Sequence, residues 1–275
     1  MGDQIRAGIV GFTGYSGAEA VKILRGHPSA EPVLLEHRAQ SDAERPTFDD
    51  HLERFPFTAE GLAEAKLDIV FLATSHDVSL EAVPLCLAAG TRVVDLSGSF
   101  RLRTPEAVHR WYGLDHPDPK LLADAVYGLP ELYREKIRGA RFVSNPGCYP
   151  TAANLAIHPL LAAGVVDRSA GIICDGKSGV SGTGKKPSAR THFCEVTENF
   201  SAYSVMFHRH TPEVLQNCGL EEKDFTFVMQ LLPLHRGILE TIYARTLKPL
   251  THDDIDRVYR EAYGGEPFVR IYPEG

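Results

Sequence analysis

Gly11-Phe12-Thr13-Gly14-Tyr15-Ser16-Gly17 is the stretch of this sequence that says most about its fold. It follows an apolar run over residues 5–10, which predicts a first strand, and it opens a helix predicted over residues 17–26. Glycines in such a turn let the backbone approach a pyrophosphate, which the helix N-terminus then favours. The spacing is a variant of the usual dinucleotide fingerprint, so a plain tight turn stays open as an alternative.

The rest of the first half alternates between strand and helix patterns. Further strands are predicted at residues 32–36, 68–73 and 91–96, with a helix over residues 80–89. Such alternation is typical of a parallel sheet with helices on both faces. Residues 38–57 are polar and predict a solvated loop, and residues 101–141 predict a long excursion that returns to the sheet at residues 140–143.

The pattern changes close to Cys148. A helix over residues 151–163 is followed by long apolar runs, which predict strands at residues 171–175, 225–232 and 238–246. A last helix over residues 253–263 has a capping residue in Thr251. This half reads as an antiparallel α+β layer, and we therefore predict two domains, residues 1–147 and 148–275.

Composition and charge argue against a general nucleic-acid-binding protein and against a membrane-spanning one. The 275 residues carry a net charge of −7, which argues against general nucleic-acid affinity. No stretch of about 18 apolar residues exists, so no membrane span is predicted. Five cysteines without metal-type spacing indicate free thiols in a reducing compartment, and we expect a cytoplasmic protein.

Cys148 lies in the run Ser144-Asn145-Pro146-Gly147-Cys148-Tyr149-Pro150-Thr151. Pro146 and Gly147 predict a turn before the sulfur, and Pro150 can open a helix after it. A thiol at a helix N-terminus is stabilised as the thiolate, which attacks carbonyl carbon. The alternative is a buried cysteine, which we expect for the other four residues of this type: Cys86, Cys174, Cys194 and Cys218.

A nucleophile needs a proton carrier, and Phe207-His208-Arg209-His210-Thr211-Pro212-Glu213 is the densest histidine cluster. In an extended segment His208 and His210 would point the same way, with Arg209 opposite. Histidine can stabilise the thiolate and move a proton near neutral pH. A pair of metal ligands and a purely structural pair stay open as alternatives.

Three other segments are candidates for binding anions. Ser181 and Gly182 lie in a glycine-serine loop with three lysines, which suits phosphate or the nicotinamide but also fits a surface loop. Arg101 follows a strand end and suits a carboxylate, or a salt bridge. The second strand ends Glu36-His37-Arg38, where Arg38 favours the 2′-phosphate of NADP and Glu36 leaves NAD open.

These residues together resemble the N-acetyl-γ-glutamyl-phosphate reductase family, which is related to aspartate-semialdehyde dehydrogenase. The motifs that carry the resemblance run across almost the whole chain: residues 11–17, 95–101, 127–131, 144–151, 178–184, 208–213 and 232–239. The cysteine octapeptide and the His-Arg-His-Thr-Pro-Glu run are the most specific of them.

The resemblance implies a Rossmann-type NADP-binding domain, a catalytic and oligomerisation domain, and a homodimer or homotetramer. It assigns Cys148 as nucleophile and His210 as acid/base. Implied cofactor contacts are Gly11, Thr13, Gly14, Tyr15, Ser16, Gly17, Arg38, Ser97, Ser181 and Gly182. Implied substrate contacts are Arg101, Asn145, Glu198 and His208.

The implied reaction is the NADPH-dependent reduction of N-acetyl-glutamyl 5-phosphate through a thioester, in arginine biosynthesis. Aminoadipyl or aspartyl phosphate is the alternative substrate. Two departures stand out: Met229-Gln230 replaces the family's usual Pro-His, and the family continues past Gly275 with further strands and a helix. A non-catalytic NADP-binding remnant is therefore a second expectation.

Overall fold

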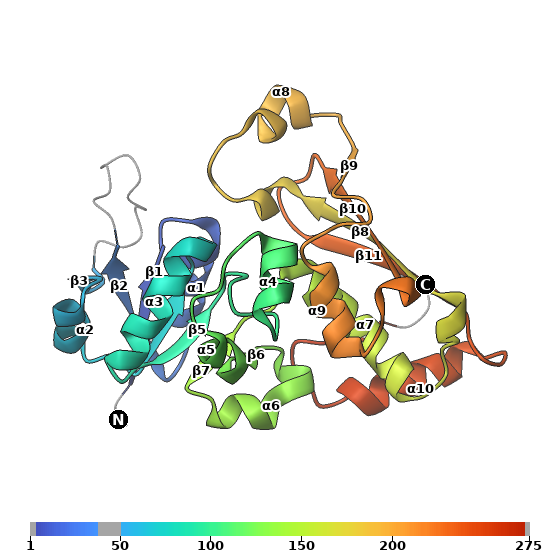
Figure 1. The fold of residues 1–275 in the computed structure, drawn as a ribbon, viewed down its shortest axis with the longest axis horizontal. Helices are drawn as coiled ribbons and strands as arrows, with labels where there is room; N and C mark the ends of the chain where they lie inside the picture. The colour runs from blue at the N-terminus through green and yellow to red at the C-terminus, as the bar shows by residue number, and fades with distance from the viewer. Residues whose placement is uncertain (1–3, 38–50, 273–275) are drawn as a thin grey trace. The chain divides into compact units, whose positions relative to one another are not determined.

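The computed structural model describes residues 4–37 and 51–272, and its chain divides into two compact units, Met1–Pro146 and Gly147–Gly275 (Figure 1). The first unit is a parallel sheet with helices, and the second is a mixed sheet with helices. The α/β class predicted from the alternating pattern is confirmed.

Seven strands form the sheet of the first unit, in the order β3-β2-β1-β4-β5-β7-β6, and every pair is parallel. They are β1 (Ile5–Val10), β2 (Ala30–Glu36), β3 (Arg54–Pro56), β4 (Ile69–Leu72), β5 (Arg92–Asp95), β6 (Val126–Tyr127) and β7 (Phe142–Ser144). The chain builds outward from β1 to β3 and then returns to β4 beside β1. This reversal is the switch point at which such sheets bind ligands.

Helices cover both faces of this sheet, because its strands bury side chains on both sides. Ile9 and Leu34 pack with Val21 of α1, whereas Val10 and Leu35 belong to a larger core on the opposite face. The helices are α1 (Tyr15–Arg25), α2 (Ala59–Ala65), α3 (His76–Ala88), α4 (Pro105–Tyr112), α5 (Pro119–Asp124) and α6 (Pro130–Gly139).

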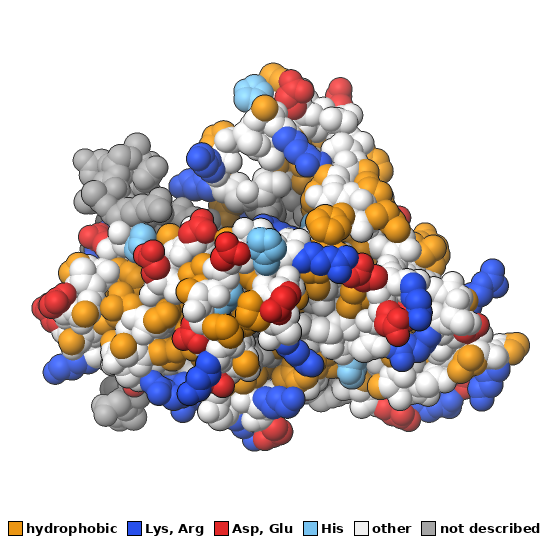
Figure 2. All heavy atoms as spheres, viewed as in Figure 1, with side chains coloured by type: hydrophobic (Ala, Val, Ile, Leu, Met, Phe, Trp, Pro, Cys, Tyr) orange, Lys and Arg blue, Asp and Glu red, His pale blue; other side chains and the backbone are white. Residues whose placement is uncertain are grey.

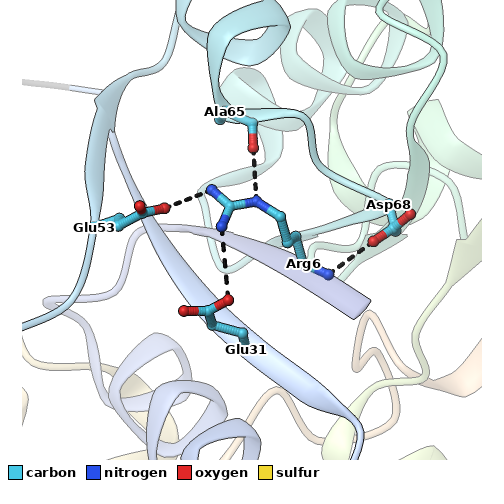
Figure 3. Close-up of polar contacts among 5 residues, drawn as sticks. All are labelled: Arg6, Glu31, Glu53, Ala65 and Asp68. Atoms are coloured by element: carbon cyan, nitrogen blue, oxygen red, sulfur yellow. Dashed lines mark hydrogen bonds and ion pairs between the residues drawn. The ribbon is translucent and has the colours of Figure 1, made fainter. Parts of the chain in front are cut away.

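Arg6 fastens the beginning of β1 to its surroundings (Figure 3). Its main-chain N–H donates to Asp68, 2.8 Å away, and its Nε donates to the carbonyl of Ala65 at 3.0 Å. The guanidinium also pairs with Glu53 at 2.5 Å and Glu31 at 3.6 Å. These contacts lie at the end of β1 opposite the glycine-rich turn.

Two expectations for the first unit need correction. The loop predicted over residues 38–57 contains β3, because the backbone of residues 54–56 pairs with β2 in a strand too short for sequence periodicity to reveal. Residues 38–50 lie outside the described part of the chain. The excursion over residues 101–141 contains three helices and the short strand β6.

The second unit has a four-stranded sheet in the order β11-β8-β10-β9. Its elements are α7 (Cys148–Ala162), β8 (Ile172–Gly179), α8 (Phe193–Val196), β9 (Ser201–Tyr203), α9 (Thr211–Cys218), β10 (Phe225–Leu232), β11 (Ile238–Ala244) and α10 (His252–Tyr263). The expected antiparallel layer is wrong in one pair: β8 and β10 are parallel, because the chain crosses over through α8, β9 and α9 between them. The other two pairs are antiparallel.

One face of this sheet is the core of the second unit. Alternate residues of β8 and β10 pack against α7, with Tyr149 and Ile157 among the largest buried side chains. The predicted cap of α10 is confirmed, since Thr251 and Asp254 form a capping box. These hydrogen bonds lower the pKa of Asp254 to about 2.

Candidate functional site

Cys148 is the first residue of α7, and Gly147 is the N-cap, with no side chain capping the helix. Its thiol is exposed, whereas Gly147 and Tyr149 on either side are buried. A helix of 15 residues therefore presents the positive end of its dipole to an accessible sulfur. This is the environment that the octapeptide predicts.

The remaining cysteines behave differently. Cys86, Cys174 and Cys218 are buried, and burial raises the pKa of Cys86 and of Cys218 to about 12. The expectation of burial is wrong for Cys194, which is exposed on α8. Among the five cysteines, Cys148 is therefore the one that combines an exposed thiol with a position at the N-terminus of a long helix.

His208 and His210 are both buried and Arg209 is exposed, as the alternation predicts. The backbone is not extended, however. Residue 210 has φ −86° and ψ −10° and is the N-cap of α9, so a turn rather than a strand brings the rings together. Their centroids are 4.8 Å apart.

The two histidines have different environments. Nδ1 of His208 accepts a hydrogen bond from the main-chain N–H of His210 at 3.1 Å. Its ring packs edge-on against Tyr149 at 5.6 Å and Tyr203 at 5.5 Å. Burial, with a smaller effect of the Arg209 charge, lowers the pKa of His208 to about 4. His208 is therefore neutral near pH 7 and supports its neighbour.

His210 lies against the turn that precedes Cys148. A Cβ atom on Gly147 would lie 2.7 Å from Nε2 of His210 and 2.9 Å from Oε1 of Glu213. Glycine at this position therefore lets the imidazole and the carboxylate approach the main chain next to Cys148. Glu213 is fully buried, and its Oε2 accepts from the N–H of Gly147 at 2.9 Å.

Tyr149 joins α7 to the sheet of the second unit. Its hydroxyl donates to the carbonyl of Gln230 at 3.3 Å and accepts from the hydroxyl of Tyr203 at 3.1 Å. Burial raises the pKa of Tyr149, which keeps the phenol neutral. These contacts hold the first turn of α7 against β9 and β10.

The glycine-rich turn has the geometry that its sequence predicts. Gly11 has φ +78°, and a Cβ there would lie 2.3 Å from the carbonyl oxygen of Ala73. A Cβ on Gly17 would lie 2.2 Å from the carbonyl oxygen of Gly11. Gly14 is the N-cap of α1 and has no side chain to cap the first N–H groups of the helix, a setting that suits an anion.

A second loop of the first unit is organised by Asp95, which is fully buried at the end of β5. Its carboxylate accepts from the hydroxyl of Ser79 at 2.8 Å and from the hydroxyl and N–H of Ser97 at 2.7 and 3.0 Å. Arg101 is buried and donates to the carbonyls of Asn145 and Leu96, both at 2.8 Å. Arg101 thus holds the main chain of Asn145, close to the end of the first unit.

Comparison with known proteins agrees with this geometry. The family model "Semialdehyde dehydrogenase, NAD binding domain" matches residues 6–140, and "Semialdehyde dehydrogenase, dimerisation domain" matches residues 148–275. An N-acetyl-gamma-glutamyl-phosphate reductase of Dehalococcoides mccartyi is 42% identical over 98% of this chain and 80% of its own length. The enzyme of the same name from Symbiobacterium thermophilum is 46% identical over the same shares. The chain belongs to the N-acetyl-gamma-glutamyl-phosphate reductase family.

Solved structures support the fold of this reductase-family chain. Aspartate semialdehyde dehydrogenase II of Vibrio cholerae matches 95% of the chain and 80% of its own length, with a TM-score of 0.66 and 16% identity. The Candida albicans aspartate semialdehyde dehydrogenase solved with NADP matches 94% and 76%, with a TM-score of 0.67 and 16% identity. The Rossmann-type unit and the second unit thus follow the semialdehyde dehydrogenase fold.

The other residues assigned from the reductase family lie in varied surroundings. In the glycine-serine loop, the N–H groups of Val180 and Ser181 donate to the carbonyls of Leu234 and His235 at 2.8 and 3.1 Å. These two N–H groups are therefore already used within the protein. Glu198 is exposed after α8 with φ +56°. Tyr15 and Ser16 are exposed on the first turn of α1. Arg38 lies outside the described residues.

Glu213 and Tyr149 surround Cys148 and His210 in the second unit, and Asp95 organises a loop of the first unit, but none of the three was assigned from the sequence. Glu213 belongs to the quoted histidine run and stands three residues after His210, a spacing at which Glu often caps a helix. That spacing is the signal that could have identified it.

Over residues 4–37 and 51–272 no helix is long and apolar enough to cross a membrane.

Proposed function

We propose that this chain catalyses the NADPH-dependent reduction of N-acetyl-L-glutamyl 5-phosphate to N-acetyl-L-glutamate 5-semialdehyde and phosphate, in arginine biosynthesis. The observation that carries the proposal is the exposed Cys148 at the N-terminus of α7, with His210 against the preceding Gly147. The names of the relatives at 42–46% identity support the acyl phosphate as substrate.

In the first step, the Cys148 thiolate attacks the acyl carbon. A carbon–sulfur bond forms, the bond from carbon to the phosphate oxygen breaks, and phosphate leaves with the electron pair. N–H groups at the start of α7 stabilise the oxyanion of the tetrahedral intermediate, a contribution of roughly 3–4 kcal/mol per donor in comparable sites. A cationic His210 favours the thiolate before the attack.

In the second step, the thioester on Cys148 is reduced. When bound, a nicotinamide cofactor would supply the hydride. The oxyanion that results collapses to the aldehyde, the carbon–sulfur bond breaks, and Cys148 leaves as the thiolate. No proton has to reach the carbon-bound oxygen in this step: the proton that His210 takes from the Cys148 thiol before the attack passes to the phosphate that leaves in the first step.

The first unit fits a dinucleotide. The turn needs glycine at positions 11 and 17, because a Cβ atom at either position would clash with a main-chain oxygen. The N-terminus of α1 has no capping side chain, which suits a pyrophosphate. We propose NADP rather than NAD. In support, Glu36 at the end of β2 pairs with Arg54 at 3.3 Å, which reduces its capacity to accept from a ribose hydroxyl.

We also propose that the protein is a homodimer or homotetramer that associates through the outer face of the second sheet. Ile173, Leu239 and Tyr243 share this face and are 46%, 64% and 55% exposed. Figure 2 shows hydrophobic side chains gathered where Figure 1 draws β8, β10 and β11. An exposed apolar sheet face indicates a protein contact, so Tyr243→Asp should lower the mass measured by light scattering.

A cytoplasmic location is proposed from the cysteines. Cys148 must be a free thiol to act, and the exposed Cys194 also carries a free thiol. Free accessible thiols persist in reducing compartments.

The reverse reaction tests the proposed function. Purified protein is given N-acetylglutamate semialdehyde, phosphate and NADP⁺, and formation of NADPH is followed by absorbance. We expect phosphate-dependent activity in the parent and in Cys194→Ser, and none in Cys148→Ser. NADP binding with no turnover in the parent would instead support a non-catalytic remnant, and higher rates with aminoadipyl or aspartyl semialdehyde would change the substrate.

A further inference from the structure

Glu213 is a buried acid that the proposed reaction has not yet used. It is the third residue of α9, and its side chain is fully buried. A buried carboxylate is costly unless hydrogen bonds compensate for lost water. One such hydrogen bond is donated by the N–H of Gly147 to Oε2 of Glu213, at 2.9 Å.

The direction of this side chain is unusual for its place in the helix. A Glu at the third helical position commonly accepts from the N–H of the N-cap residue. Here the N-cap is His210, and its N–H donates instead to Nδ1 of His208 at 3.1 Å. Glu213 therefore bonds to another helix, at the residue directly before Cys148.

The second carboxylate oxygen and the imidazole converge on one point. A Cβ on Gly147 would lie 2.9 Å from Oε1 of Glu213 and 2.7 Å from Nε2 of His210. Both side chains thus approach the same main-chain atom, and a carboxylate within about 6 Å of an imidazole favours its cationic form. It also fixes the orientation of the ring on which proton transfer depends.

Other titratable groups lie on the elements around His208, His210 and Gly147. They are Cys148 and Tyr149 from α7, Tyr203 from β9, and His208 with the exposed Arg209 from the turn. Burial raises the pKa of both tyrosines and lowers that of His208 to about 4, so these three are neutral near pH 7. Among these groups, Glu213 is the carboxylate that can balance a cationic His210.

We propose that Glu213 is a positioning residue: it holds the Gly147 peptide in place, and its charge keeps His210 cationic beside the Cys148 thiolate. The inference rests on the proposed roles of Cys148 and His210. It predicts that removing the charge while keeping the shape of the side chain raises the pH at which Cys148 becomes reactive.

The test is the rate of alkylation of Cys148 by iodoacetamide between pH 5 and 9, without substrate or cofactor. Mass spectrometry of the peptide that carries Cys148 gives the rate, and the exposed Cys194 is the internal reference. The variants are Glu213→Gln, Glu213→Ala and, as a matched loss of charge at an exposed position, Glu222→Gln. Circular dichroism of each variant reports on folding.

We expect alkylation of Cys148 at pH 6.5 to be about tenfold slower in Glu213→Gln, which corresponds to a shift of one pH unit in the profile. Cys194 in that variant and Cys148 in Glu222→Gln should keep the parent profile. A parent-like profile in Glu213→Gln, with a loss confined to Glu213→Ala, would show that only the shape of the side chain matters. Slower alkylation of both thiols would also overturn the proposal.

The same preparations are assayed for turnover, so that the two proposals can fail separately. A parent that lacks turnover but shows the shift in Glu213→Gln refutes the proposed function alone. A parent that turns over but shows no shift refutes the role of Glu213 alone.

Discussion

Nδ1 of His208 accepts the main-chain N–H of His210, and this one contact separates the roles of two histidines in a His-x-His pair. An imidazole that accepts at Nδ1 is neutral there and carries its proton on Nε2. His208 therefore orients the start of α9, while His210 lies against Gly147, where we propose that it carries a proton. Sequence alone gives both residues the same chemistry.

The buried His208 should make the protein sensitive to acid. Its pKa is about 4 in the folded chain and 6.5 in the ordinary state, so between these values the unfolded chain binds a proton that the folded chain does not. Stability is therefore lost as pH falls from about 6.5 to 4. Urea titrations at pH 7 and pH 4.5 should show that the parent loses roughly 2–3 kcal/mol more than His208→Gln. Equal losses would contradict the neutral state of His208.

Gly14 and Gly17 should respond differently to alanine. At Gly17 a Cβ would lie 2.2 Å from a main-chain oxygen, so Gly17→Ala should lower the free energy of unfolding by about 2 kcal/mol or more. At Gly14 the nearest atom is 3.4 Å away, so Gly14→Ala should fold normally and weaken NADPH binding by crowding the pyrophosphate. Urea denaturation and calorimetric titration measure the two effects. Normal NADPH affinity in Gly14→Ala would argue against this turn as the cofactor site.

Arg101 offers a choice between two roles. Its donors bond to the carbonyls of Asn145 and Leu96, so Arg101→Lys should lower the free energy of unfolding by about 1–3 kcal/mol. A residue that only grips the substrate would leave stability unchanged and raise KM. Urea denaturation with steady-state kinetics on one preparation distinguishes these outcomes.

Glu240 should make stability fall as pH rises. Both carboxyl oxygens are buried on β11, and burial raises the pKa of Glu240 to about 8 from 4.5. Between these values the folded chain holds a proton that the unfolded chain releases, so this contribution is full below pH 4.5 and is lost as pH rises through 8. Glu240→Gln should therefore stabilise the protein at pH 8 relative to pH 5, on the order of 3 kcal/mol. An unchanged difference between the two pH values in urea titrations would refute this.

Local patterns predicted much of the fold. The first strand and β10 have the predicted bounds, since long apolar runs carry a clear period. β3 was not predicted, because a strand of three residues is too short to show a hydrophobic period. The parallel pairing of β8 with β10 was not predicted either, because it depends on a crossover that no local pattern encodes.

The sequence predicted the cysteine and the histidines of the candidate site, but not the hydrogen bonds that hold them in place. Cys148 and the His-x-His pair follow from turn chemistry and residue type. The bond from Gly147 to Glu213 and the bond from Arg101 to Asn145 join residues far apart in sequence, and only the folded chain shows them.

The central claim is that Cys148 carries the acyl group. The most direct measurement mixes the protein with N-acetyl-glutamyl 5-phosphate in the absence of reduced cofactor, quenches in acid, and locates the added mass by peptide mass spectrometry. We predict an N-acetylglutamyl thioester on the peptide that carries Cys148, and its disappearance when NADPH is added before the quench. Acylation of another residue, or full turnover in Cys148→Ser without a thioester, would contradict the account.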